Sequence, residues 1–279
     1  MTLTSALLLM VSSFAVSVFL SVVVIVSRLV RNARNTAAEK RRVRLRPYVL
    51  HILDEQPPTI DSLRERRALA AIVSDYSGHV RGGDRGLLVR WLESMGFDLD
   101  CIVRMRSPFP FRRAHALRHF APLAGSHIAV MTQMITDRNP RVRMLAAQIA
   151  GLSGNDAFVP VLLNSIVSPR RRIPVGIVSM AILRTAPANA APFASALRSS
   201  DPSSRSLAIE LAGRLTLADA RVPIEDGLRA LDERVRAASL NALERIGSPL
   251  SQQALQNFSA RSEKELALLV RAQESVSGL

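Results

Sequence analysis

Residues 139–151, NPRVRMLAAQIAG, decide the fold of this 279-residue chain. Asn139 belongs to the residue types that accept hydrogen bonds from the free amides of a first helical turn, and Pro140 has a φ that already suits the first helical position. Small and aliphatic residues then recur at helical spacing as far as Gly151. Residues 232–247, DERVRAASLNALERIG, repeat the pattern. Both stretches therefore predict a capped helix with one apolar face.

The same pattern recurs through the second half of the chain at intervals of 32, 29, 33 and 31 residues. A cap residue followed by proline or glutamate stands at Ser107-Pro108, Asn139-Pro140, Ser168-Pro169, Asp201-Pro202 and Asp232-Glu233. Four residues after the cap, the first copy has Phe111, but the other four carry an arginine: Arg143, Arg172, Arg205 and Arg236. Because their position recurs, we expect these arginines to bond acidic groups or carbonyls in neighbouring turns and so to hold the fold together.

A second set of apolar segments lies between these helices, at 156–167, 189–200 and 219–231, each with a proline near its start: Pro160, Pro192 and Pro223. Residues 126–136 occupy the equivalent place without a proline. One unit is thus helix, turn and helix in about 31 residues. Such units bury their apolar faces only by stacking on their neighbours, which predicts an all-α protein built as a right-handed α-solenoid.

The repeat resembles the HEAT-repeat family, particularly its short bacterial form. The residues that carry the likeness are Pro140, Val142, Arg143, Ala146, Ala147 and Gly151, then Glu233, Val235, Arg236, Ala237, Ala238 and Gly247, together with the second-helix prolines. The resemblance covers about residues 107–260 and extends more loosely to 61–106. It implies a curved stack of HEAT-like helix pairs that serves as a binding surface, usually without chemistry of its own.

The N-terminus predicts a membrane anchor. Residues 6–26 are apolar apart from serines and would span roughly 31 Å as a helix, close to the thickness of a hydrocarbon core. A cleaved signal peptide is the competing interpretation, but no positive charge precedes the apolar run, and the run is too long. We expect a single-pass transmembrane anchor at 1–27, a basic juxtamembrane segment at 28–46 and the repeat domain at 47–279. The positive charge after the span places the repeats in the cytoplasm and the N-terminus outside.

The basic segment holds eight cations and one anion, a net of +7 out of the chain's +14. Attraction to anionic membrane lipid explains it without a specific ligand, and the predicted lipid contacts are Arg28, Arg31, Arg34, Arg41, Arg42 and Arg44. Within the apolar run, Ser13, Ser17 and Ser21 recur every four residues. Small residues at this spacing permit close helix packing in lipid, although serines are also simply tolerated in such anchors.

No pattern of residues predicts catalysis. His115 and His119 have a metal-chelating spacing but no evident third ligand, the single Cys101 has no catalytic context, and 81–86 (RGGDRG) lacks the Lys-Ser/Thr of a phosphate loop. We therefore predict no enzyme, metal, cofactor or small-molecule substrate. Two further arginines in the basic stretch 168–174 (SPRRRIP), Arg170 and Arg171, are the candidates for contact with a partner.

These features predict a membrane-anchored cytoplasmic scaffold that binds a protein partner. The likeness to anchored bacterial HEAT proteins suggests an integral membrane enzyme, such as a polysaccharide glycosyltransferase, as that partner. The alternative is a nucleic-acid-binding protein similar to HEAT-like DNA glycosylases. After residue 46 the balance is 29 cations to 22 anions, with one Trp and two Tyr for stacking, which makes nucleic acid the less favoured partner. The HEAT-like bilin lyases would require an active site that the sequence does not indicate.

Overall fold

A computed structural model describes residues 3–56, 58–60, 62–258 and 263–277 of the chain, and every regular element in those ranges is helical. The prediction of an all-helical protein is thus confirmed. The helices form two compact units, Met1–Met95 and Gly96–Leu279. This division falls inside the range that was predicted as a single repeat domain.

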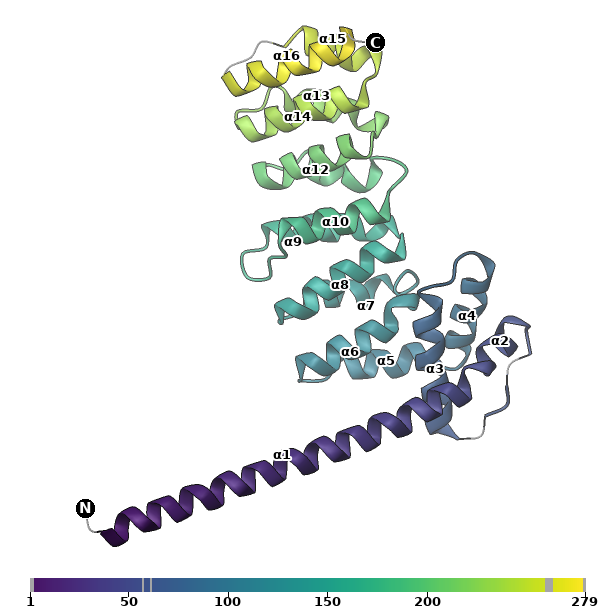
Figure 1. Ribbon diagram of the computed structural model, residues 1–279. Coiled ribbons are helices and arrows are strands. Elements are labelled where there is room, and N and C mark those ends of the chain that lie inside the picture. Colours follow the sequence, from purple (N-terminus) through teal and green to yellow (C-terminus); the bar gives the residue numbers. More distant parts are fainter. Residues whose placement is uncertain (1–2, 57, 61, 259–262, 278–279) are drawn as a thin grey trace. The chain divides into compact units, whose positions relative to one another are not determined.

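Unit 1 contains α1 (Leu3–Leu45), α2 (Pro47–Leu53), α3 (Leu63–Ser77) and α4 (Gly83–Ser94). The end of α1 packs on α2 and α3, and α2 also packs on α4 (Figure 1). Aliphatic side chains from all four helices are buried together, including Leu45, Val49, Val73 and Leu92. Pro47 lacks the amide proton that would continue α1, so a new helix begins there.

Helix α1 has 43 residues and is about 65 Å long at 1.5 Å per residue. It continues without a break across residues 27 and 28, where the sequence suggested a boundary between anchor and basic segment. In the part of the chain that the structure describes, no helix is long and apolar enough to cross a membrane. The side chains of residues 1–16, which include most of the predicted span, lie outside the described part.

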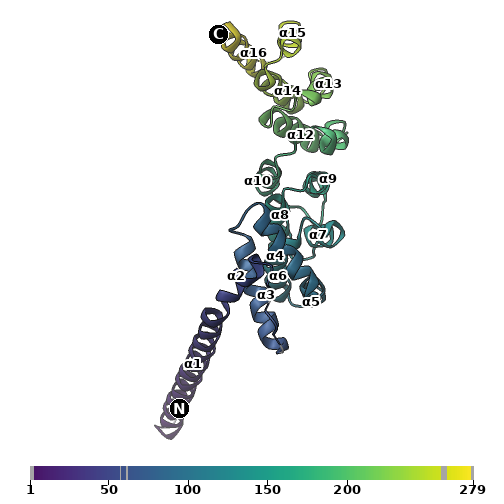
Figure 2. The same cartoon turned by 90° about the vertical axis from the view of Figure 1, so that its right-hand side faces the viewer.

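Unit 2 alternates two sets of helices. We call α6, α8, α10, α12, α14 and α16 row A, and α5, α7, α9, α11, α13 and α15 row B. Their bounds are α5 Phe97–Met105, α6 Pro110–Phe120, α7 Ile128–Ile135, α8 Pro140–Ser153, α9 Val159–Val167, α10 Val175–Thr185, α11 Ala194–Leu197, α12 Pro202–Arg214, α13 Arg221–Gly227, α14 Glu233–Ile246, α15 Pro249–Gln256 and α16 Glu263–Ser277. Successive row A helices pack on one another, and each also packs on a row B helix. Figure 2 shows the two rows from the side.

Short 3-10 turns lead into four of the row B helices: η1 Ala121–Leu123, η2 Asp156–Phe158, η3 Ala191–Phe193 and η4 Ala218–Ala220. Pro160 is the second residue of α9 and Pro192 the second residue of η3, positions where a missing amide proton costs nothing. Three phenylalanines at these corners are fully buried: Phe120 at the end of α6, Phe158 in η2 and Phe193 in η3. These turns therefore bring each row B helix back against its row A partner.

Three of the five predicted helix starts are confirmed. The side chains of Asn139, Asp201 and Asp232 accept hydrogen bonds from first-turn amides of α8, α12 and α14. The other two predictions are wrong. Helix α6 begins at Pro110 instead of Pro108. Helix α10 begins at Val175 instead of Pro169, because Pro174 disfavours a helical conformation at the residue before it.

Two glycines set the distance between row A helices. Gly151 in α8 lies against Ala181 of α10, so that a Cβ atom on Gly151 would stand 2.6 Å from the Ala181 Cα. Gly213 in α12 lies against Ala242 of α14 in the same way. Both glycines lie in the last turn of their helices, close to the ends at Ser153 and Arg214. The chain leaves α8 and α14 at Gly154 and Gly247, which have positive φ.

Candidate binding surfaces

The described half of the apolar run presents its side chains to the outside. From residue 19 to residue 29 every side chain of α1 is exposed, including Phe19 at 67%, Val24 at 60% and Leu29 at 62%. Eleven consecutive positions cover all sides of a helix. A helix that is apolar all round is typically buried in a protein core or a membrane. Exposure of these apolar side chains to water is therefore unfavourable.

The predicted serine face is described only in part. Ser13 lies outside the described side chains, while Ser17 and Ser21 are exposed on the same side of α1. The Ser21 hydroxyl donates to the Ser17 carbonyl oxygen at 2.9 Å. Its hydrogen-bonding capacity is thus met within the helix, which allows the residue to lie in an apolar environment.

The basic segment divides into two parts. Arg28 is exposed, and the side chains of Arg31 and Arg34 lie outside the described part. Arg42 and Arg44, by contrast, form ion pairs with Asp75 and Glu65 of α3. Arg41 is half-buried and has no ion pair in the described part of the chain. Arg42 and Arg44 therefore help to hold the end of α1 on α3, whether or not they also contact lipid.

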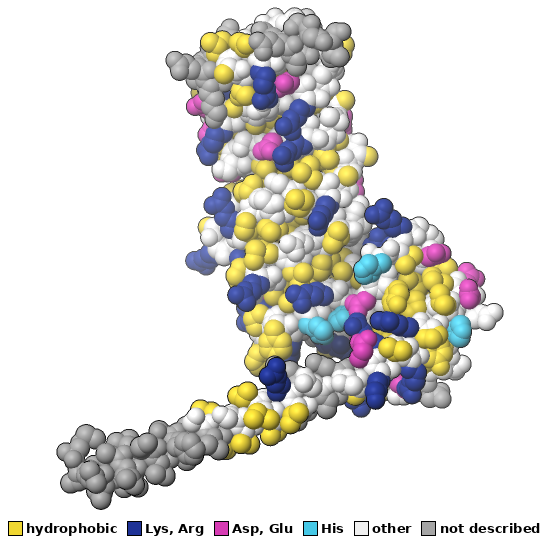
Figure 3. Space-filling model, viewed as in Figure 1, with side chains coloured by type: hydrophobic (Ala, Val, Ile, Leu, Met, Phe, Trp, Pro, Cys, Tyr) yellow, Lys and Arg dark blue, Asp and Glu magenta, His cyan; other side chains and the backbone are white. Residues whose placement is uncertain are grey.

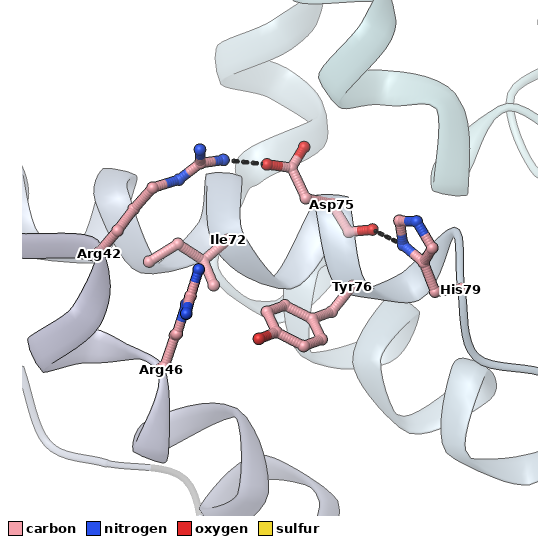
Figure 4. Close-up of a pocket in the computed structure, with 6 residues that line it drawn as sticks. All are labelled: Arg42, Arg46, Ile72, Asp75, Tyr76 and His79. Carbon is pink, nitrogen blue, oxygen red and sulfur yellow. Dashed lines mark hydrogen bonds and ion pairs between the residues drawn. The ribbon is translucent and has the colours of Figure 1, made fainter. Parts of the chain in front are cut away.

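These ion pairs border a pocket of about 360 Å³ in unit 1, drawn in Figure 4. Arg42 reaches it from α1 and Arg46 from the junction between α1 and α2, while Ile72, Asp75 and Tyr76 line it from α3. The His79 Nδ1 atom lies 2.9 Å from the Asp75 carbonyl oxygen. Two guanidinium groups suit a small anion, but the Asp75 carboxylate already compensates Arg42. This pocket could not be predicted from local sequence patterns, because it joins Arg42 and Asp75, which lie 33 positions apart.

Three arginines in unit 2 make the same contacts, each from the fourth residue of a row A helix. Arg113, Arg143 and Arg236 each donate from Nη1 to the carbonyl oxygens five and six residues earlier, at 2.6 to 3.2 Å. All three are buried. Because these carbonyl oxygens belong to the loop between a row B helix and the next row A helix, the arginine fastens that loop to the helix that follows it.

The same side chains also reach the following repeat. Arg113 binds both carboxylate oxygens of Asp137 at 2.8 Å, and Arg236 binds Glu265 at 2.7 Å. Arg143 donates instead to the backbone oxygen of Arg172 at 3.3 Å. Sequence analysis missed Arg113 and both carboxylates. Counting from Pro110 instead of Pro108 would have placed Arg113 at the repeated position.

Two of the four predicted structural arginines differ from the expectation. Arg172 lies in the loop before α10 and is exposed, because that helix begins only after Pro174. Arg205 stands at the fourth position of α12, but its buried Nε atom has no hydrogen-bond partner in the described part of the chain. Of the four predicted arginines, only Arg143 and Arg236 therefore make the expected hydrogen bonds.

The partner candidates Arg170 and Arg171 are both exposed in the loop between α9 and α10. Arg171 donates from Nη1 to the Thr136 carbonyl oxygen of the preceding loop at 2.8 Å. The loop itself is fixed by the buried Ile173, whose amide donates to the Ser165 carbonyl oxygen at 3.3 Å. The arginines thus project from a loop that is held in place at two points.

The histidine pair makes a ring contact. His115 and His119 stack edge to face, with ring centroids 4.7 Å apart. Among the described residues no group of three or more His, Cys, Asp or Glu side chains is placed to hold a metal ion. Burial raises the pKa of the Cys101 thiol to about 12, so the thiol is protonated at neutral pH and is a poor nucleophile.

The chain was compared with models of protein families and with curated proteins. No family model matches it, and no curated protein matches it significantly.

Proposed function

We propose that the protein is a membrane-anchored scaffold whose stacked helix pairs bind a protein partner. The observation that carries this proposal is the fully exposed apolar surface of α1 between residues 19 and 29. Burying apolar area stabilises by about 25 cal/mol per Å². Eight exposed large apolar side chains on one segment thus favour transfer into a membrane.

The length and flanks of the segment support a single crossing. The apolar run of residues 6–26 matches the hydrocarbon thickness, and serine hydroxyls bonded to their own helix are tolerated there. Arg28 marks the end of the run, and the cationic residues beyond it favour the cytoplasmic side. The N-terminus then lies outside the cytoplasmic membrane, and both units after residue 45 lie within the cytoplasm.

The repeats supply the binding surface. In unit 2, successive row A helices pack on one another, and this arrangement supports the proposal of an α-solenoid. A solenoid has a large surface for its mass and suits recognition of another protein. An anchored scaffold meets membrane proteins at a high effective concentration. We infer that the partner is an integral membrane protein, with a polysaccharide glycosyltransferase as the first enzyme class to examine.

Membrane extraction tests the proposal. A charge at the centre of a membrane helix costs about 2.5–3.5 kcal/mol, so Leu20→Arg combined with Val23→Arg should move much of the full-length chain from the membrane pellet to the alkaline-carbonate supernatant. Val43→Arg is the matched control, because Val43 is 55% exposed on the same helix but beyond the apolar run. Wild-type chain that is fully extracted by carbonate would refute the anchoring.

A further inference from the structure

Three loops on one edge of unit 2 gather most of the charge of that unit. They join α5 to α6, α7 to α8 and α9 to α10, and with their flanking helix ends they comprise residues 104–113, 136–143 and 168–174, which we call the arginine edge. It contains ten arginines and one acid, Asp137, a net of +9 in 25 residues. With the +7 of residues 28–46, this leaves −2 for all other residues together. The basic excess after residue 46 is therefore concentrated and not spread along the chain.

The three loops adjoin in space. Arg138 of the second loop donates to the Pro108 carbonyl oxygen of the first at 2.9 Å. Arg171 of the third donates to the Thr136 carbonyl oxygen of the second at 2.8 Å. The loops lie above one another on the left-hand side of unit 2 in Figure 1, and dark blue side chains line that side in Figure 3. The three loops therefore bring their arginines to one edge of unit 2.

Most of this charge is uncompensated. Arg113 and Arg143 are buried and bonded as described above, and Arg104 is paired with Asp100. In the described part of the chain the other seven arginines are exposed and form no ion pair: Arg106, Arg112, Arg138, Arg141, Arg170, Arg171 and Arg172. A guanidinium group has five N–H donors. Arg138 and Arg171 each use one donor to hold their position, and their remaining donors can bind an external anion.

Apolar side chains are exposed beside these arginines. Phe109 and Phe111 are 50% and 67% exposed, and the Arg112 guanidinium carbon lies 5.1 and 5.8 Å from their ring centroids. Val167 and Val175 flank the third loop and are 46% and 41% exposed. This combination suits an anionic membrane surface. The arginines can bind lipid phosphates, and the phenylalanines and valines beside them can enter the headgroup region. Nucleic acid would use the arginines and the rings but would gain nothing from the valines.

We propose that the arginine edge is a second membrane-binding surface, which holds unit 2 against phosphate-bearing anionic lipid headgroups. The exposed guanidinium groups bind the lipid phosphates, and the phenylalanines insert among the headgroups. This contact is separate from the insertion of α1 and does not depend on it.

Fluorescence quenching of the full-length chain in vesicles tests the proposal. A fluorophore is attached at Pro169→Cys in the third loop, and at Ala188→Cys in the α10–η3 turn at the other end of α10 as the control; the native Cys101 is buried and stays unlabelled. The vesicles contain phosphatidylcholine alone or with phosphatidylglycerol, plus a lipid that carries a quencher near its headgroup. We expect quenching at position 169 only in the anionic vesicles, reversed by salt, and no quenching at position 188.

Charge-neutralising variants assign the effect to the edge. Each cation near an anionic surface contributes about fivefold to binding, so Arg141→Gln, Arg170→Gln and Arg172→Gln together should lower the salt-sensitive binding roughly hundredfold and remove the quenching. The matched control neutralises three exposed arginines at the opposite helix ends, Arg118, Arg184 and Arg245, and should preserve it. None of these six side chains forms an ion pair in the described part of the chain, so both variants should fold.

Three outcomes would overturn the proposal: equal quenching in neutral vesicles, equal loss in the control variant, or no quenching with anionic lipid. Tight binding of duplex DNA that only the edge variant loses, without lipid-dependent quenching, would make nucleic acid the partner instead. Failure of the anchor is distinguishable, because the chain would then not float with neutral vesicles while quenching by anionic vesicles persisted.

Discussion

Gly151→Ala should loosen unit 2 at the contact between α8 and α10. The added Cβ would lie 2.6 Å from both the Cα and the carbonyl oxygen of Ala181, where ordinary contact begins at 3.4 Å. Since the opposing atoms are backbone, no side-chain rotation relieves the clash, and the two helices must separate by about 0.8 Å. Overpacking of this kind costs typically 1–3 kcal/mol. For a unit of this size, 2 kcal/mol corresponds to a Tm about 4–8 °C lower.

Helical circular dichroism on heating of the full-length chain measures the effect. Fluorescence of the single tryptophan does not, because Trp91 lies in unit 1. The matched control is Gly176→Ala in α10, where an added Cβ meets nothing within 4 Å; it should leave Tm unchanged or raise it, because alanine favours a helix by up to about 1 kcal/mol over glycine. If Gly151→Ala melts at or above the wild-type temperature, the close approach of α8 and α10 is not a constraint on the fold.

Other predictions concern buried groups. Arg113→Met should lower the free energy of unfolding by about 3–5 kcal/mol, because it leaves the buried Asp137 carboxylate without its partner; urea unfolding measures this, and a loss below about 1 kcal/mol would contradict it. Arg205→Met should cost far less than Arg143→Met in the same assay. The Nε atoms of both arginines lack a partner among the described residues, but Arg143 donates from its Nη atoms to three carbonyl oxygens and no such bond forms at Arg205 in the described part of the chain. With its pKa raised to about 12 by burial, the Cys101 thiol should react with a disulfide reagent only in denaturant; fast reaction of the folded chain would show that the site opens.

The sequence predicted those parts of the fold that depend on local signals. Asn139 and Asp232 cap their helices as expected, because a side-chain acceptor beside free amides acts within one turn. The start of α10 was mispredicted because either Pro169 or Pro174 could precede the helix. In the structure Ile173 is buried and the helix begins only after Pro174. Of the arginine edge, the sequence singled out only the third loop, 168–174. The edge as a whole could not be predicted, since its charge becomes large only when repeats of about 31 residues bring three loops together.

The position of an arginine relative to the helix start separates structural arginines from those available to bind. A side chain at the fourth helical residue points back toward the N-terminus, and there Arg113, Arg143 and Arg236 find the carbonyls of the preceding loop. Arg141, at the second helical residue, does not turn back in this way and stays exposed. Arg138 and Arg171 in the loops reach one carbonyl oxygen each of a neighbouring loop and also stay exposed. Pro174 therefore has a consequence beyond the helix it starts, because it moves Arg172 from the first group to the second. By delaying α10, this one proline adds a free cation to the arginine edge and leaves the Arg172 backbone oxygen as the acceptor for Arg143.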